Sequence, residues 1–592
     1  LQQVAAPRQE HLSLDADVNA SGSGAITRST GAGTLAATGG NLTLNAATGI
    51  GDIGGTAPVA IGTVGGSLSA TNTTSGDLYL STGGITLGGG GASLSEVAGG
   101  ELRVDSSGNI VIGGNVTVGG AGTITLNTAG TITRTGGTLT APTVALGPNT
   151  APTSIGASGT PVVTAATTLL DAVSTAGDIW LSNTGNVNVE ASATEGVVDI
   201  VNSGTINTAA GGLSASGTGT ETVTVQGDSD ITVDENITGE EGVLIESTGN
   251  DTLLSHSAGT IDGTNTTLEL RADKMDLAGA GIGNAATDIV LLRPANLADA
   301  IDVGSAVDST ADTLELSDTE LDTITGVLTI GTTGVTGGIT VTAAVDTLNV
   351  SDMSLVAAGA VNDGGGATGI TEANLTIDAD GGVSFTGSGN AVGALDVTNN
   401  TGGNIAFTNG AAMTVTAVNN VGGGTIDITN TVGTTDTAAG GISSSGAGAA
   451  NISITSAGDL GIGHNVSAGD TGSVTLRVNG AGGTLSHTAG TISSASGGAI
   501  TLQADEMSLA GTSISSSGTV YVRSETVSDA LDLGSNPATA NVLELSDAEL
   551  DIVTAGTQLV LGGDGTTEMT GGVTVTAAVD PANAANVAVQ QD

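Results

Sequence analysis

Residues Gly122–Thr140 read GTITLNTAGTITRTGGTLT, an alternating pattern. Threonine occupies almost every second position, and the residues between include Ile124, Leu126, Ile132 and Leu139. Successive side chains of a β-strand point to opposite faces, so alternation of apolar and polar residues is typical of a half-buried strand. The sequence therefore predicts strands whose isoleucines and leucines face a core and whose threonines form the outer wall.

Glycine and asparagine interrupt this pattern at short, regular intervals. Ile110 with Ile112 and Val116 with Val118 form two further apolar pairs upstream. Such spacing is too short for helices and too regular for a disordered tract. Three strands of this kind make a coil of about 20–24 residues, a period typical of solenoid proteins. We predict an all-β fold, a right-handed, three-sided parallel β-helix (β-solenoid) that forms an elongated rod of roughly 27 coils spaced by about 4.8 Å.

Short phrases recur nearly verbatim along the chain. LSHSAGTI at Leu254 returns as LSHTAGTI at Leu485, and GGITVTAAVD at Gly337 returns as GGVTVTAAVD at Gly571. A unit of about 230 residues is therefore duplicated. No linker or change of composition separates the units, so we predict one continuous solenoid over residues 1–592. The predicted half-units are residues 1–131, 132–253, 254–360, 361–484 and 485–592, of which 254–360 and 485–592 are the most alike.

The composition narrows the function. The chain has 98 Gly, no Cys, one Trp, two Tyr and two Phe, and 9 Lys and Arg against 59 Asp and Glu give a net charge of −50. This charge repels the phosphates of nucleic acids, so we expect no nucleic acid partner. No apolar run is long enough for a transmembrane helix. Enzymes that process polysaccharides need clustered carboxylates and usually aromatic platforms, so we expect no enzyme and keep a polysaccharide-processing β-helix enzyme as a minor alternative.

The repeat phrases also carry a resemblance. GNLTLNAATGIGD at Gly40 and LLRPANLADAIDVGS at Leu291, followed by LELSDTELD and GGITVTAAVD, resemble the large β-strand-repeat surface proteins of bacteria. These are the filamentous-haemagglutinin-like exoproteins, and the resemblance covers nearly the whole chain. It implies secretion to the extracellular space or the cell surface, a β-helical shaft, and a role in adhesion, biofilm matrix or surface filaments.

Two acidic phrases form the candidate metal site. SDTELD at Ser317 returns as SDAELD at Ser546. Carboxylates this close together could share a Ca²⁺ ion, which accepts oxygen ligands in flexible geometry. The alternative is a Ser-x-x-Glu capping box that opens one helical turn on the flank of the solenoid. Calcium is the one cofactor that the sequence suggests, and its candidate ligands are Asp318, Glu320, Asp322, Asp547, Glu549 and Asp551.

Ionisable residues recur at one position of the repeat. They follow an inward-facing apolar residue by two positions, which places their stems near the core face or at a corner. We expect corner packing or a bridge to an acidic neighbour, with partner recognition as the alternative. These residues are Arg28, Arg134, His256, Asp363 and His487. A second recurring set favours a repeated ion pair, Arg293 with Asp299 and Arg523 with Asp529.

Together these features predict a mechanical role: an extracellular structural protein that forms a rigid fibre by head-to-tail stacking of solenoid subunits. A solenoid exposes a strand edge at each end, and neither HLSLDADVNA near the start nor AANVAVQQD at the end reads as a cap. The expected partner is a second copy of the chain, with cell-surface or polysaccharide contacts as further partners. The alternatives are the shaft of an adhesin within a longer secreted exoprotein and, from the Thr-x-Thr motifs, an ice-binding face.

Overall fold

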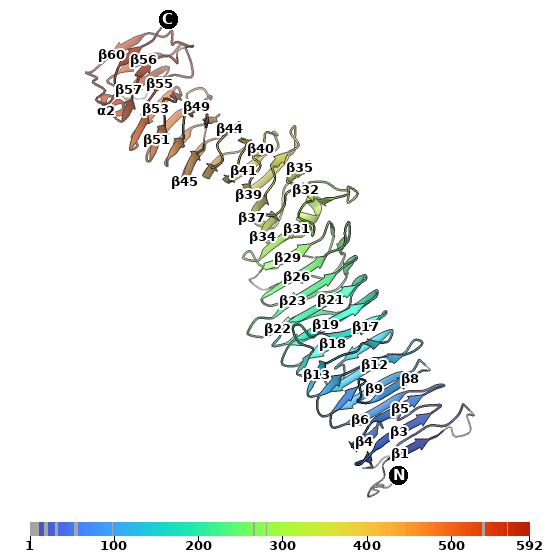
Figure 1. Cartoon of the computed structure of the whole chain (residues 1–592). Helices are drawn as coiled ribbons and strands as arrows, with labels where there is room; N and C mark the ends of the chain where they lie inside the picture. The colour runs from blue at the N-terminus through green and yellow to red at the C-terminus, as the bar shows by residue number, and fades with distance from the viewer. Residues whose placement is uncertain are drawn as a thin grey trace. The chain divides into compact units, whose positions relative to one another are not determined.

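The computed structural model describes residues 11–16, 22–29, 33–52, 57–97, 99–263, 267–279, 281–446, 448–535, 539–564 and 566–591. Within them, stacked parallel strands form a β-solenoid of about 22 turns (Figure 1). Helix in this part of the chain is confined to α1 (Asp318–Leu321) and α2 (Asp547–Asp551). The predicted all-β parallel solenoid is confirmed, with fewer turns than expected because several turns are longer than the predicted period.

The chain divides into two compact units, Leu1–Val290 and Leu291–Asp592. Whether the half-units predicted from the repeats are structural units stays a prediction.

Each unit contains many short strands. Strands of the first unit include β1 (His11–Asp15), β3 (Asn41–Ala46), β4 (Val59–Val64), β6 (Leu78–Thr82), β9 (Glu101–Ser106), β10 (Ile110–Ile112), β11 (Val116–Val118), β12 (Thr123–Thr128), β13 (Thr131–Arg134), β14 (Leu139–Thr140), β15 (Thr143–Leu146), β16 (Ser154–Ile155), β17 (Val162–Ala165), β18 (Leu169–Ser174), β19 (Ile179–Thr184), β20 (Val187–Thr194), β21 (Val198–Ser203), β22 (Ile206–Ser216), β24 (Ile231–Val233), β25 (Ile237–Gly239), β27 (Leu253–His256) and β30 (Lys274–Leu277). Those of the second unit include β32 (Ala300–Val303), β35 (Ile339–Val341), β37 (Val350–Ala357), β38 (Val361–Asp363), β39 (Gly369–Ala379), β41 (Ala391–Asn399), β43 (Met413–Asn420), β45 (Thr435–Ser444), β47 (Leu460–Ile462), β48 (Val466–Ala468), β50 (Thr484–His487), β53 (Glu506–Leu509), β56 (Ala530–Leu533), β59 (Gln558–Leu561), β60 (Val573–Val575) and β61 (Val587–Val589).

The alternating segment Gly122–Thr140 contains three strands of the first unit, β12, β13 and β14. Its four predicted core residues, Ile124, Leu126, Ile132 and Leu139, are fully buried. Strand β10 pairs with β13, β11 with β14, and β12 with β15, so each coil here has three strands as predicted. The outer wall differs from the prediction at Thr125 and Thr128, which are both buried; the Thr128 hydroxyl is satisfied there by donating to Gly108 O at 2.6 Å.

Other coils have two long strands instead of three. Ile155 in β16 and Val162 in β17 both lie opposite β19, at Ile179 and Leu181. Two faces of one coil therefore merge into a single face in the next. From β18 to β22 each coil consists of two strands, since β18 pairs with β20 and β20 with β22, while β19 pairs with β21. The three-sided cross-section is thus present in only part of the solenoid.

The phrase TAAGG splits one long strand into two. It occurs at residues 208–212 in β22 and 437–441 in β45. Strand β22 pairs with β24 before the phrase and with β25 after it, and β45 pairs in the same way with β47 and β48. Gly212 and Gly441 have φ angles of +65° and +69°, which glycine adopts without strain. A short glycine bulge therefore sets the number of faces of the next coil.

Buried asparagines connect neighbouring coils at the corners. The Nδ2 of Asn183 donates to the Oδ1 of Asn202, 19 residues on, and the Nδ2 of Asn399 donates to the Oδ1 of Asn420, 21 residues on. These separations measure the length of a coil: 21 residues lies within the predicted period, and 19 residues lies just below it. Each amide also bonds to backbone groups of the corner, so the buried polar atoms are satisfied.

We expect Asn399→Ala to loosen its coil more than any surface change nearby. The buried amide of Asn399 donates to the Gly402 and Gly403 carbonyls and accepts from the Gly382 N–H. Groups left unsatisfied in the core cost about 1–3 kcal/mol each, so the free energy of local opening should fall by about 3 kcal/mol. Hydrogen exchange of the β41 and β43 amides measures it. Asn400→Ala, next in the chain and exposed, is the control and should change it little; equal effects would contradict this role.

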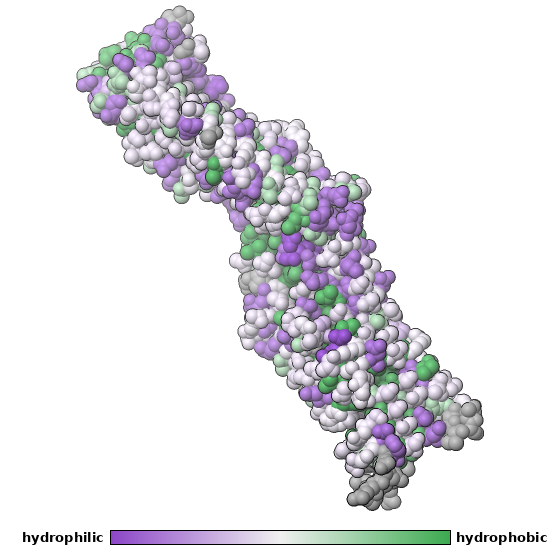
Figure 2. Space-filling view, viewed as in Figure 1, coloured by the Kyte–Doolittle hydropathy of each residue, from purple (hydrophilic) through white to green (hydrophobic). Residues whose placement is uncertain are grey.

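The surface of the solenoid is mostly polar and of small side chains. On the face in view, green apolar atoms form separate small groups among white and purple ones (Figure 2). Most core residues are Leu, Ile, Val and Ala, and the one aromatic stack described is Phe385 on Phe407, with ring centroids 5.8 Å apart. Exposed large apolar residues that lie close together therefore stand out as candidates for a contact surface.

Candidate functional site

Strand β60, beside β56 near the C-terminus of the second unit (Figure 1), exposes apolar side chains that face the core. Val573 and Val575 lie opposite Leu531 and Leu533, both of which are buried in the core. The two valines nevertheless have 37% and 64% of their surface exposed. Their orientation is that of core residues, but their environment is that of a surface.

An earlier copy of the same phrase provides the matched comparison. GGITVTAAVD places Ile339 and Val341 in β35, where they are 1% and 0% exposed. Strand β35 has a neighbour on both sides, β32 and β38, whereas β60 pairs only with β56 among the described residues. The two phrases are nearly the same, so the exposure of β60 reflects the lack of a covering strand within the described residues.

The next strand, β61, repeats this arrangement. Val587 and Val589 lie opposite two buried leucines of β59 and are 46% and 45% exposed. The equivalent residues of the earlier repeat, Met353 and Leu355 in β37, are 0% exposed because β39 covers them. These four valines of β60 and β61, which we call the end face, form an open apolar layer with unpaired strand edges.

The acidic phrases form capping boxes, as the alternative to calcium predicted. The Ser317 hydroxyl accepts from the Glu320 N–H at 3.3 Å, and the Glu320 carboxylate accepts from the Ser317 N–H at 2.7 Å. Ser546 and Glu549 make the same two bonds at the start of α2. Each box satisfies donors that the first turn of a helix leaves free.

The aspartates of these phrases hold the chain segment of the following turn. Asp547 Oδ1 accepts from the Asp580 N–H at 2.6 Å, and Asp551 Oδ1 accepts from the Ala582 N–H at 3.0 Å. Asp318 and Asp322 hold residues 346 and 348 in the same way. Among the described residues, no three His, Cys, Asp or Glu side chains are grouped so that they could hold a metal ion. Calcium binding by the six candidate residues stays a prediction.

We expect the pair of substitutions Asp547→Ala and Asp551→Ala to destabilise the last turns of the second unit by about 1 kcal/mol per lost hydrogen bond. Asparagine keeps a side-chain oxygen acceptor, so Asp547→Asn with Asp551→Asn should retain most of the stability. The midpoint of thermal unfolding, measured with and without millimolar calcium, compares the variants. A calcium-dependent rise in the parent protein that the asparagine variant lacks would show that the carboxylates bind the ion.

The recurring ionisable position is a corner contact. Arg134 Nε donates to Gly137 O at 2.7 Å, His256 Nε2 lies 3.1 Å from Gly259 O, and His487 Nε2 lies 3.2 Å from Gly490 O. Each side chain therefore bonds to the carbonyl of a glycine three residues further on. Asp363 instead accepts from the Gly365, Thr386 and Gly387 N–H groups. The predicted corner packing is confirmed for the residues Arg134, His256, Asp363 and His487.

His256 and His487 are the most confined of these residues. Both are fully buried, in β27 and β50. Since a carbonyl only accepts, each Nε2 carries the proton and each Nδ1 is the bare nitrogen, which has no hydrogen-bond partner. Burial lowers the pKa of both imidazoles, against the opposing effect of backbone hydrogen bonds. A Cβ added at Gly279 or Gly511 would lie within 2.6 Å of the ring, so glycine is required beside each histidine.

The expected ion pair of Arg523 with Asp529 is wrong. Arg523 Nε lies 3.0 Å from Asp564 Oδ2, and Arg523 Nη1 donates to Ser524 O. Asp529 instead accepts from the Ser524 hydroxyl at 2.8 Å, and burial raises the pKa of its carboxyl. The repeat phrase places these residues near each other, but Asp564, which the repeat comparison does not single out, is the partner of the guanidinium.

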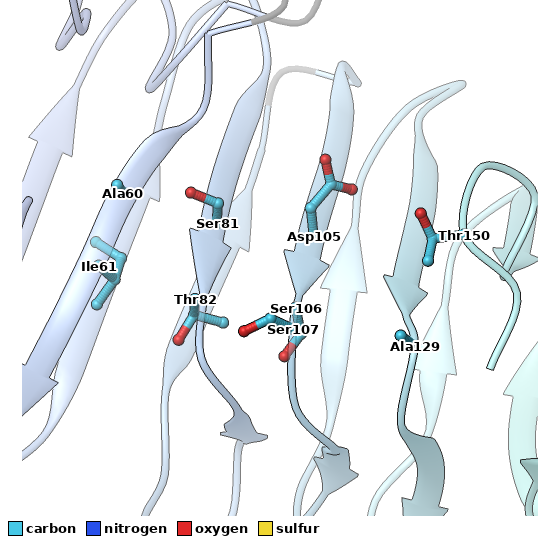
Figure 3. A pocket seen from close by; sticks show the side chains of 9 residues that line it. All are labelled: Ala60, Ile61, Ser81, Thr82, Asp105, Ser106, Ser107, Ala129 and Thr150. Atoms are coloured by element: carbon cyan, nitrogen blue, oxygen red, sulfur yellow. The ribbon is translucent and has the colours of Figure 1, made fainter. Parts of the chain in front are cut away.

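An open groove of about 540 Å³ crosses the outer face of the first unit. The residues that line it come from successive strands, beginning with β4, β6 and β9, and their small side chains lie in a row (Figure 3). The hydroxyls of Ser81, Ser107 and Thr150 make no hydrogen bond within the described part of the chain. The lining residues are Ala60, Ile61, Ser81, Thr82, Asp105, Ser106, Ser107, Ala129 and Thr150.

The one carboxylate of this groove is already engaged. Asp105 accepts from Arg103 Nε at 3.0 Å, from Asn127 Nδ2 at 2.7 Å and from the Tyr79 hydroxyl. Burial acts to raise the pKa of Asp105, but these hydrogen bonds outweigh it and hold the pKa below its usual range. Burial, with the bond to Asp105, raises the pKa of Tyr79 to about 12. The arrangement is suited to hydrogen bonding and lacks a free acid or base.

Sequence reasoning identified the strand phrases near both termini but missed the end face and the groove. The signal for the end face was present, since the duplicated phrase GGVTVTAAVD shows which residues face a core. The groove depends on which small residues line up across coils, and this follows only from the register. None of the described helices is long and apolar enough to cross a membrane. The chain matches no known family model, no curated protein and no solved structure.

Proposed function

We propose that the chain is a structural protein of the extracellular space that forms a fibre by head-to-tail stacking of solenoid subunits. The observation that carries this proposal is the end face: Val573, Val575, Val587 and Val589 face the core direction and are exposed. Transfer of apolar surface out of water favours association by about 25 cal/mol per Å². A further coil laid on the end face would bury these side chains and pair the open edges of β60 and β61.

Head-to-tail contacts use two different surfaces, so they propagate into a filament when the rotation between subunits does not close a ring. The net charge of −50 opposes this association, because neighbouring subunits repel each other. Screening by salt weakens this repulsion. Assembly should therefore increase with ionic strength and with protein concentration. Secretion and a place in a biofilm matrix or on the cell surface are supported by the resemblance to bacterial surface exoproteins, and we include them in the proposal.

Electron microscopy and sedimentation of the purified chain test the proposal. The expected result is a population of unbranched fibres that grows when salt rises from low to physiological concentration. A species of 56.2 kDa at every salt and protein concentration would overturn the homopolymer. A fold check by circular dichroism, with a β-rich spectrum, keeps this outcome from being confused with misfolding.

A second candidate function is an adhesin shaft, within a longer exoprotein, that contacts polysaccharide. The groove favours it, because the free hydroxyls of Ser81, Ser107 and Thr150 along it suit neutral sugars. Dextran is a suitable neutral probe, and Ser81→Val with Ser107→Ala removes two hydroxyls at little cost to the fold. Binding of dextran by the parent chain and not by this variant would support the second candidate. Equal binding of dextran by the parent chain and the variant would exclude the groove as the binding site.

A further inference from the structure

Strands β37 and β61 occupy equivalent places in two copies of the repeat. Before β37, the Asp346 N–H bonds to Asp318 Oδ1, and before β61 the Asp580 N–H bonds to Asp547 Oδ1. The two segments VDTLNVSDMSLVA at Val345 and VDPANAANVAVQQ at Val579 are therefore held by equivalent helical turns of the preceding coil, and they align residue by residue.

In the interior, β39 covers β37. Met353 lies opposite Leu375, Ser354 opposite Thr376, and Leu355 opposite Ile377, with the two strands parallel. All four of the apolar side chains are buried. The covering segment reads NLTIDAD over residues 374–380. Any strand that takes its place on β61 needs the same alternation of inward and outward residues and the same direction.

The first described strand of the chain carries this sequence pattern. Residues 11–17 read HLSLDAD, which matches NLTIDAD at the Leu, Asp, Ala and Asp positions and replaces Thr by Ser and Ile by Leu. Strand β1 pairs in parallel with β3 on one side, where Leu12 lies opposite Leu42 and Leu14 opposite Leu44. Within the described residues it has no partner on the other side, and both of its leucines are only half-buried.

We infer that β1 of a second copy adds to β61 in one fixed register: Leu12 opposite Val587, Ser13 opposite Ala588, and Leu14 opposite Val589. This inference rests on the proposed fibre and specifies its joint. The half-exposed leucines of one end and the exposed valines of the other then form a continuous core row. Asp15 comes to lie opposite Gln590, whose amide can donate to its carboxylate, as Asn400 does to Asp378 in the interior.

Disulfide trapping tests the register, because the chain contains no cysteine of its own. Ser13 and Ala588 lie on the outward side of their strands, so the variant Ser13→Cys with Ala588→Cys places two thiols on adjacent parallel strands about 4.8 Å apart, within the range of Cα separations that a disulfide bridges. The matched control is Ser13→Cys with Gln590→Cys, in which the shift of two residues separates the Cα atoms by roughly 8 Å, too far for a disulfide. Both variants are assembled at physiological salt and oxidised.

The expected result is that the first variant gives a ladder of covalent multimers on a non-reducing gel, while the control stays a monomer. A mixture of the two single variants, Ser13→Cys and Ala588→Cys, should give covalent dimers and nothing larger, since each copy then has one thiol. Fibres that form without this cross-link, or that cross-link through the control pair, would overturn the register and leave the fibre proposal standing. Absence of fibres in every variant and in the parent chain would overturn both.

Discussion

Val587→Asp with Val589→Asp is expected to abolish fibre formation while leaving the solenoid folded. Both side chains face the core direction, and a second coil laid over them would bury two carboxylates without partners. An unpaired buried charge costs several kcal/mol, so two of them oppose the joint strongly. In the free subunit the same positions are about half exposed, so the carboxylates remain in water and the fold is retained.

The matched control for this change is Ala588→Asp with Gln590→Asp, on the outward side of the same strand. It adds the same charge, so it should slow assembly only by electrostatic repulsion. Added salt should then restore the rate of assembly. Sedimentation at matched salt compares the variants, and thermal unfolding by circular dichroism verifies the fold. Fibres of normal yield from the core-facing variant would show that the end face is not the joint.

Acidification should destabilise the second unit through His487, which is the second large effect. Burial lowers the pKa of this imidazole in the folded state, whereas in the unfolded chain the pKa returns to about 6.5. Below that value the unfolded state binds a proton that the folded state does not. The free energy of unfolding should therefore fall by about 1.4 kcal/mol per pH unit until the folded pKa is reached, and be unaffected above pH 7. His256 should act in the same way in the first unit.

Some carboxyls act in the opposite direction. Burial, with the charge of Glu190, raises the pKa of Asp171 to about 6, so the folded state takes up a proton before the unfolded state does and gains stability between about pH 6 and pH 4. The contribution of one histidine to the pH dependence of stability is therefore measured by comparing a variant with the parent. His487→Gln, which keeps a donor for the Gly490 carbonyl, should flatten the pH dependence of the thermal midpoint between pH 6.5 and 4.5 relative to the parent. His464→Gln, on a half-buried histidine of the same unit, is the control. If the thermal midpoints of the parent and of both variants changed with pH in parallel, His487 would not be the group responsible.

The strand phrases were predictable because each coil repeats a local pattern. Ile124 and Leu126 alternate with polar residues, and alternation alone decides which side chains face the core. The period followed from the spacing of such pairs, and the buried Asn399 and Asn420 show the same spacing in the structure. The Ser-x-x-Glu capping boxes were also predictable, since both bonds join residues within one helical turn.

What the sequence could not predict depends on contacts between coils. The merging of two faces at β19 follows from the register of β16 and β17 against it, which no local pattern specifies. The acidic phrases also hold a distant segment, since Asp547 and Asp551 bond to N–H groups about thirty residues further on, and closeness in sequence does not reveal such contacts. The sequence indicated that AANVAVQQD forms no cap, but the exposed fraction of Val587 could not be predicted, since a valine that faces the core has the same local pattern with or without a covering strand.

X-ray diffraction from oriented fibres of the purified chain determines whether solenoid coils stack along a fibre axis and continue across the joint. If they do, the strands lie perpendicular to the fibre and the spacing of about 4.8 Å between coils gives a sharp reflection along the fibre axis. A 4.8 Å reflection perpendicular to the axis, or a chain that remains a 56.2 kDa monomer and yields no fibre to orient, would contradict the account.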